Sequence, residues 1–114
     1  MRRRRYYNFM KPLTLIMLPF FLSSGLALAG APEGKELYTA KCQSCHGPNG
    51  EGKAAIAKMF NVTLPALASK EVQAKSDAEL KKVITAGKGK MKPVAGITDK
   101  QADDVVAYVR TLKP

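Results

Sequence analysis

The chain has 114 residues, enough for one domain, and carries 19 Lys and Arg residues against nine Asp and Glu. Of its net charge of +10, five positive charges lie before residue 30, which leaves residues 30–114 with a net charge of +5. That modest excess suits contact with acidic proteins and excludes a polycation built for nucleic acid, as does the small number of aromatic side chains after residue 29, namely Tyr38, Phe60 and Tyr108.

The first 29 residues have the pattern of a secretory signal peptide. Residues 2–5 are all arginine, and a 17-residue apolar run from Leu13 to Ala29 ends in Ala-Leu-Ala. A basic head, an apolar middle and small residues at the cut site are typical of such signals. We expect cleavage after Ala29, a mature domain over residues 30–114, and a periplasmic or otherwise extracytoplasmic location. An uncleaved membrane anchor is the alternative, although the run only just reaches spanning length.

Short helices and turn-rich segments alternate in the first half of the mature chain. A helix is expected over residues 33–44, directly after Pro32, because proline suits the first turn of a helix. The glycine-rich stretch 46–53 must be a loop. Residues 53–60 can form a short helix, and Pro65 interrupts the stretch that follows.

Two better-marked helices follow, each opened by a capping box. Ser76 with Glu79 starts one that closes at Gly87, and Thr98 with Gln101 starts one whose apolar residues recur at helical spacing. No segment alternates apolar and polar residues for long enough to suggest a strand. The sequence therefore predicts an all-α fold of three to four short helices, with loops long enough to wrap around a bound group.

The stretch CQSCHG holds both cysteines, Cys42 and Cys45, and the only histidine, His46. The spacing C-x-x-C-H is the attachment pattern of a c-type haem. Each thiol can form a thioether with one haem vinyl group, and His46, on the same helical turn, can bind the iron through Nε2. We expect one covalently bound haem c, with the Nδ1–H of His46 donating to a backbone carbonyl in the loop 47–58.

Two other interpretations of these residues remain open. A zinc corner needs about four ligands, usually Cys and His, and this chain offers three. A disulfide or redox dithiol is permitted outside the cytoplasm. The histidine directly after Cys45 and the lack of a preceding strand argue against a thioredoxin-like dithiol.

A second axial ligand has two candidates after residue 29, Met59 and Met91. Met59 lies in an apolar helical stretch, where methionine usually fills the core. Met91 lies in the lysine- and glycine-rich loop GKGKMKP, which has no local core to fill. We therefore predict Met91 as the ligand opposite His46; a loop methionine packed on the surface is the alternative. Histidine with methionine closes the iron to small molecules and tunes it for electron transfer.

The motif CQSCHG, the loop GKGKMKP about 45 residues later and the closing helix DDVVAYVRTL resemble a short class I cytochrome c of the soluble bacterial, single-haem kind. The resemblance implies the cytochrome c fold, with the N- and C-terminal helices crossed near one haem edge. It also implies that Gly34 and Tyr38 of the first helix pack against Val105 and Tyr108 of the last. The loop 49–67 matches no subgroup securely, so the haem-propionate contacts stay unassigned.

These features together predict an electron carrier rather than an enzyme. Lysines at positions 41, 53, 88, 90 and 92 flank the motif and the Met91 loop. They would steer redox protein partners with acidic docking surfaces, although an ordinary solvated surface is the alternative. We expect a monomer that meets a membrane only through partner complexes or an uncleaved signal. If Met91 is not a stable ligand, a haem peroxidase or a gas-binding module is the alternative function.

Overall fold

The computed structural model describes residues 30–114, so the predicted signal peptide and its cleavage point at Ala29 lie outside the described residues. Six helices follow one another along the chain: α1 Ala31–Lys41, α2 Gln43–His46, α3 Ala54–Phe60, α4 Lys70–Gln73, α5 Asp77–Ala86 and α6 Asp99–Thr111. Within residues 30–114 the only β-type pairing is an isolated bridge between Lys88 and Met91. The all-α prediction is confirmed. No helix in this part of the chain combines the length and apolar character needed to cross a bilayer.

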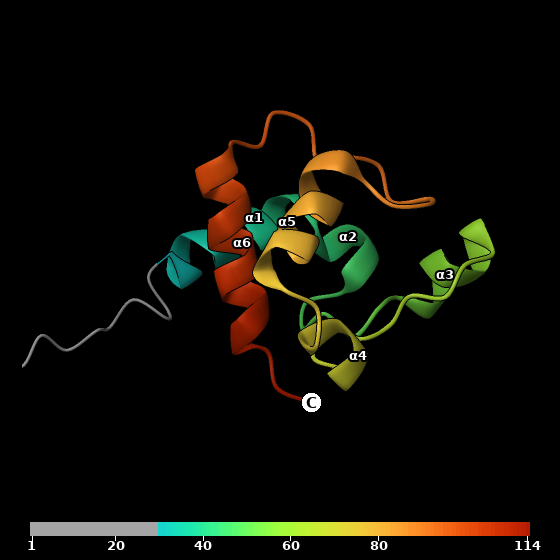
Figure 1. The fold of residues 1–114 in the computed structure, drawn as a ribbon. Coiled ribbons are helices and arrows are strands. Elements are labelled where there is room, and N and C mark those ends of the chain that lie inside the picture. Colours follow the sequence, from blue (N-terminus) through green and yellow to red (C-terminus); the bar gives the residue numbers. More distant parts are fainter. Residues whose placement is uncertain (1–29) are drawn as a thin grey trace, which may run out of the picture.

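Helices α1 and α6 form the central pair of the fold (Figure 1). They approach closely because Gly34 has no side chain: a Cβ there would overlap the carbonyl oxygen of Asp104 and lie 3.0 Å from the nitrogen of Val105. One turn further on, Tyr38 is only 1% exposed, and its ring centroid lies 5.2 Å from that of Tyr108. The contacts of the first helix with the last, implied by the family resemblance, are therefore present.

Helices α5 and α6 begin where their capping boxes predict. Ser76 Oγ accepts from Glu79 N at 3.1 Å, and the Glu79 carboxylate accepts from Ser76 N at 2.9 Å. Thr98 and Gln101 make the same reciprocal pair at 3.1 and 2.9 Å. These bonds satisfy N–H groups that a helix start otherwise leaves without a partner.

The protein's own core is small and lies along one face of α6. Its buried members are Ile84, Ala102, Val105, Val106 and Val109. Figure 1 shows α3 set apart from α1 and α6, on the far side of α2. Met59 and Phe60 at the end of α3 are 71% and 46% exposed. These two apolar side chains at the end of α3 therefore lie outside this core.

The structure has six helices where the sequence predicted three to four, because α2 and α4 are additional helices of four residues each. The first helix spans Ala31–Lys41 instead of residues 33–44, because Cys42, with a widened φ of −116°, is its C-cap and Gln43 starts a separate turn. The short helix α4 was not predicted. Its start is marked by Ser69, whose hydroxyl accepts from Val72 N at 3.3 Å.

Candidate functional site

A cavity of about 880 Å³ lies among the six helices, and every helix contributes to its lining. The volume falls near the upper end of the range of roughly 300–1,000 Å³ found for ligand and cofactor sites. Most of the lining side chains are apolar, and they include Ile56, Leu64, Leu67, Leu80, Val83, Ile84, Val94, Val105, Val106 and Val109. Such walls suit a large apolar group.

All four predicted site residues line this one cavity: Cys42, Cys45, His46 and Met91. The first three are held on a single tight turn, since the N–H groups of Cys45 and His46 both donate to the carbonyl of Cys42, at 3.3 and 3.0 Å. The two cysteines are half-buried and are not joined to each other. The short helix α2 thus presents two thiols and an imidazole to the same space.

Burial controls the protonation of these side chains. It raises the pKa of the Cys42 thiol, although Lys41 opposes the shift. A redox dithiol needs the opposite, a lowered thiol pKa, so the dithiol interpretation loses support. Burial lowers the pKa of the His46 imidazole, which favours the neutral ring. The neutral ring is the form that can bind a metal ion.

The loop after His46 is pinned by hydrogen bonds to its carbonyl groups. Gly52 N donates to the His46 carbonyl at 2.7 Å, Lys53 N donates to that of Cys45 at 3.1 Å, and the Tyr38 hydroxyl donates to that of Gly47. Gly47 adopts φ 85°, which glycine allows without strain. The turn that carries His46 is therefore fixed from α1 as well as from its own loop.

The predicted backbone acceptor for His46 Nδ1 is not found. That nitrogen is buried and has no hydrogen-bond partner among the described residues. The carbonyls of residues 45, 46 and 47 accept from Lys53, Gly52 and Tyr38, and none of them accepts from His46 Nδ1. The site offers a neutral imidazole with unused hydrogen-bonding capacity, two thiols and apolar walls. These features fit a covalently held haem.

The two candidate methionines have different surroundings. Met91 is half-buried on the cavity wall, in a tight turn closed by two hydrogen bonds with Lys88 at 2.9 and 3.0 Å. Met59 is 71% exposed and is not part of the lining. Only Met91 therefore shares the cavity with His46.

Part of the cavity wall was missed in the sequence. Val62, Leu64, Pro65 and Leu67 all line it, and Leu67 N donates to the carbonyl of Gly50 at 2.8 Å, which ties this segment to the attachment loop. The apolar residues around Pro65 are the available signal, although the sequence predicts no helix or strand for this stretch. This wall belongs to the segment that could not be aligned with the family.

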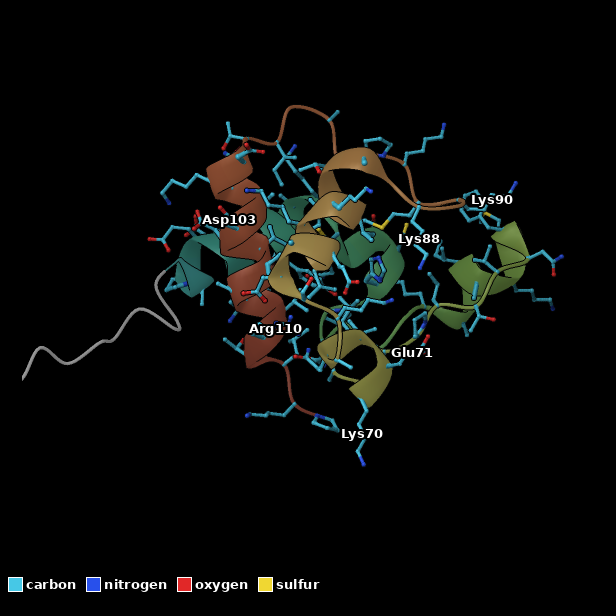
Figure 2. All side chains as sticks on the ribbon, viewed as in Figure 1. Lys70, Glu71, Lys88, Lys90, Asp103 and Arg110 are labelled. Carbon is cyan, nitrogen blue, oxygen red and sulfur yellow. The ribbon has the colours of Figure 1, made fainter. Side chains whose placement is uncertain are left out.

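Lysines surround the cavity at the Met91 loop and beside the motif. Lys41, Lys88, Lys90 and Lys92 are exposed and contribute to the lining. Figure 2 shows Lys88 and Lys90 on the loop that reaches towards α3. Lys53, predicted to belong to this set, is exposed but does not line the cavity. Among residues 30–114 no group of three His, Cys, Asp or Glu side chains is placed to hold a metal ion, so a zinc site finds no support there.

Comparisons with known proteins identify the family of this chain. The family described as "Cytochrome C oxidase, cbb3-type, subunit III" matches residues 29–109. Cytochrome c-554(547) of Halothiobacillus neapolitanus is 36% identical over 88 residues, which cover 73% of this chain and 97% of that protein.

Solved structures point the same way. The KustC0563 c-type cytochrome is 27% identical with a TM-score of 0.61, over 71% of this chain and 98% of that one. Cytochrome cL from Hyphomicrobium denitrificans is 25% identical with a TM-score of 0.58, over 76% of this chain and 49% of that one. The chain therefore belongs to the c-type cytochromes, and its function is electron transfer with a haem rather than catalysis.

Proposed function

We propose that the protein carries one haem c, attached through thioethers to Cys42 and Cys45, with His46 and Met91 as axial ligands. In this function it shuttles single electrons between extracytoplasmic redox partners. The observation that carries the proposal is that the attachment motif and the Met91 loop, about 45 residues apart in sequence, line the same apolar cavity of about 880 Å³.

The roles of the chain's own residues follow from their chemistry. The bound haem would supply a one-electron couple. Cys42 and Cys45 fix its position, neutral His46 offers a nitrogen ligand, and Met91 offers a thioether sulfur that favours the reduced ion. The apolar walls would exclude water from the group and so disfavour its more highly charged, oxidised form. With His46 and Met91 both bound, the iron would have no open position for a substrate.

The proposed partners are redox proteins with acidic docking surfaces. Exposed Lys41, Lys88, Lys90 and Lys92 beside the cavity favour association with negative surfaces. The N-terminal sequence supports export across the inner membrane, cleavage after Ala29 and a periplasmic location. The proposed form is a monomer without a membrane segment of its own once the signal is removed.

Three measurements on the exported protein test this function. Acid–acetone extraction should leave the pigment on the protein, because thioethers survive where coordination bonds do not. The Fe(III) spectrum should contain a methionine charge-transfer band that Met91→Ala removes and Met59→Ala keeps. Complete extraction of the pigment would contradict covalent attachment. Carbon monoxide binding to the reduced wild-type protein would contradict stable Met91 ligation and favour a peroxidase or gas-binding module.

A further inference from the structure

Asp104 is a buried carboxylate at the crossing of α1 and α6. The residue is 8% exposed, and its carboxylate oxygens accept from Lys100 Nζ at 3.0 and 3.3 Å. The side chain of Lys100 is itself 81% exposed, so this partner is largely solvated. Burying a carboxylate is costly unless charges or donors compensate it. One exposed lysine compensates only weakly for the cost of burying the Asp104 carboxylate.

Two glycines of the α1 region lie against Asp104. Gly34 faces its backbone, whereas Gly30 faces its side chain: a Cβ on Gly30 would overlap Oδ1 and lie 3.1 Å from the carboxylate carbon. Gly30 also has φ 93° and caps α1, and its carbonyl accepts from Gly34 N at 2.8 Å. The Cα of Gly30 is thus held next to the Asp104 carboxylate.

Gly30 is also the residue that follows the proposed cleavage point. Hydrolysis of the Ala29–Gly30 peptide bond consumes one water and leaves a carboxylate on Ala29 and an ammonium group on Gly30. We propose that Asp104 is the receptor for this new ammonium group, so that removal of the signal creates an ion pair across the α1–α6 crossing. This inference rests on the proposed cleavage after Ala29.

Local charges favour the pair. Before cleavage the Gly30 nitrogen is a neutral amide, and after cleavage it is a positively charged ammonium group bonded to the Cα that lies beside the Asp104 side chain. Asp103 on α6 and Glu33 on α1 act on Lys100 beside Asp104, and both acids would also attract the ammonium group. Lys100 repels it and competes for Asp104, so the acids at this point outnumber the base by three to one. The dipole of α1 opposes a positive charge at its N-terminus. The carboxylate offsets that repulsion, and its burial limits screening by solvent and salt.

The ion pair would form only in chains that have been exported and cut. The crossing of α1 and α6, which positions the wall of the cavity, would then reach its full stability outside the cytoplasm. Its pH dependence has a defined sign, because a neighbouring carboxylate raises the folded-state pKa of the ammonium group. The stabilisation is present below the unfolded pKa of about 8 and is lost as the pH rises through the folded pKa.

The first test uses the mature haem protein purified after export. Intact mass should show a chain that begins at Gly30. Titration of its α-ammonium group by NMR should give a pKa about one unit or more above the ordinary value of about 8. Asp104→Asn should remove this shift, whereas Asp103→Asn should keep it, since Asp103 is 62% exposed and pairs with Lys81 instead. The wild-type titration is informative even if Asp104→Asn does not fold.

A second test moves the ammonium group without changing Asp104. Insertion of Ser-Gly between Ala29 and Gly30 should lower the melting temperature near pH 7 and abolish its loss between pH 8 and pH 10. An ordinary α-ammonium pKa in a chain starting at Gly30 would overturn the inference and leave the electron-transfer function intact. A mature chain that starts elsewhere, or keeps its signal, would overturn both the inference and the proposed cleavage. Loss of covalent haem would instead contradict only the proposed function.

Discussion

The Cα of Gly34 on α1 lies directly against the backbone carbonyl of Asp104 on α6. No side chain fits between the two helices at this point. Gly34→Ala should therefore push α1 away from α6 and lower the free energy of unfolding by about 3 kcal/mol or more, as overpacking does in well-packed cores. Urea denaturation of the haem protein measures this loss.

Gly96→Ala is the control for that substitution. Gly96 has open space around it but adopts φ 72°, so alanine there costs only backbone strain of about 1–2 kcal/mol. If both variants lost the same free energy of unfolding, the close contact between α1 and α6 at Gly34 would not account for the loss.

The hydroxyl of Tyr38 holds the turn that carries His46. Tyr38→Phe removes its hydrogen bond to the carbonyl of buried Gly47 but keeps the ring packed against Tyr108. The expected loss is about 1 kcal/mol, because Gly50 N still donates to the same carbonyl at 3.2 Å. Tyr108→Phe should cost less, and an equal cost would mean that the Gly47 contact contributes nothing.

The same tyrosine predicts an alkaline limit. Burial, with smaller contributions from Cys42, Tyr108 and Glu51, raises the pKa of Tyr38 from 10.0 to about 12. The unfolded chain then loses this proton first, so stability falls as the pH rises from about 10 to about 12. Subtracting the Tyr38→Phe profile from the wild-type profile should isolate this decline, and parallel profiles would contradict it.

Arg110 on α6 fastens the chain between α4 and α5. Its guanidinium donates to Asp77 and to the carbonyl of Gln73, both at 2.9 Å, and to the carbonyl of Lys75. Lysine cannot reproduce this fork, so Arg110→Lys should lower the free energy of unfolding by about 1–3 kcal/mol. Asp77→Asn should cost little because Asp77 is 76% exposed. If Asp77→Asn cost more than Arg110→Lys, the ion pair rather than the carbonyl contacts would account for the stability.

Removal of the bound group tests how much of the fold depends on it. The double variant Cys42→Ala, Cys45→Ala should show little helix by circular dichroism, because Val83, Ile84, Val105 and Val109 line the cavity and lose their apolar partner. A cooperative melt with native-like helix content would contradict this expectation.

The lysines beside the cavity predict a salt-dependent reaction with anions. Oxidation of the reduced protein by hexacyanoferrate(III), which takes up one electron, should slow as ionic strength rises, since screening weakens the attraction. Lys90→Glu should reduce both the rate and its salt dependence. Lys35→Glu, an equal change on α1 outside the cavity lining, should alter them less. A salt-independent rate would rule out steering.

The sequence predicted those features that depend on neighbouring residues. The starts of α5 and α6 are encoded within four residues each, and the capping pairs Ser76–Glu79 and Thr98–Gln101 are present in the structure. The turn Cys42–His46 is equally local. Positions 34 and 38 could be matched to the last helix only through the family resemblance, because helical spacing alone does not identify a partner.

Features that depend on distant contacts were missed. The burial of Asp104, the fork of Arg110 and the wall 62–67 arise from residues far apart in sequence. The break at Cys42 and the lack of an acceptor for His46 Nδ1 were also not foreseen, since both depend on how the loop after the motif folds back.

All six helices contribute to the cavity lining, and this distribution has a consequence for any attempt to divide the protein. A cut in the exposed turn at residues 95–96 would leave the thiols, the imidazole and Met91 on one fragment, and most of the apolar α6 face on the other. The smaller fragment, which carries α6, could then dissociate from the larger one. Its rebinding would show whether the larger fragment still presents an apolar surface for α6 to cover.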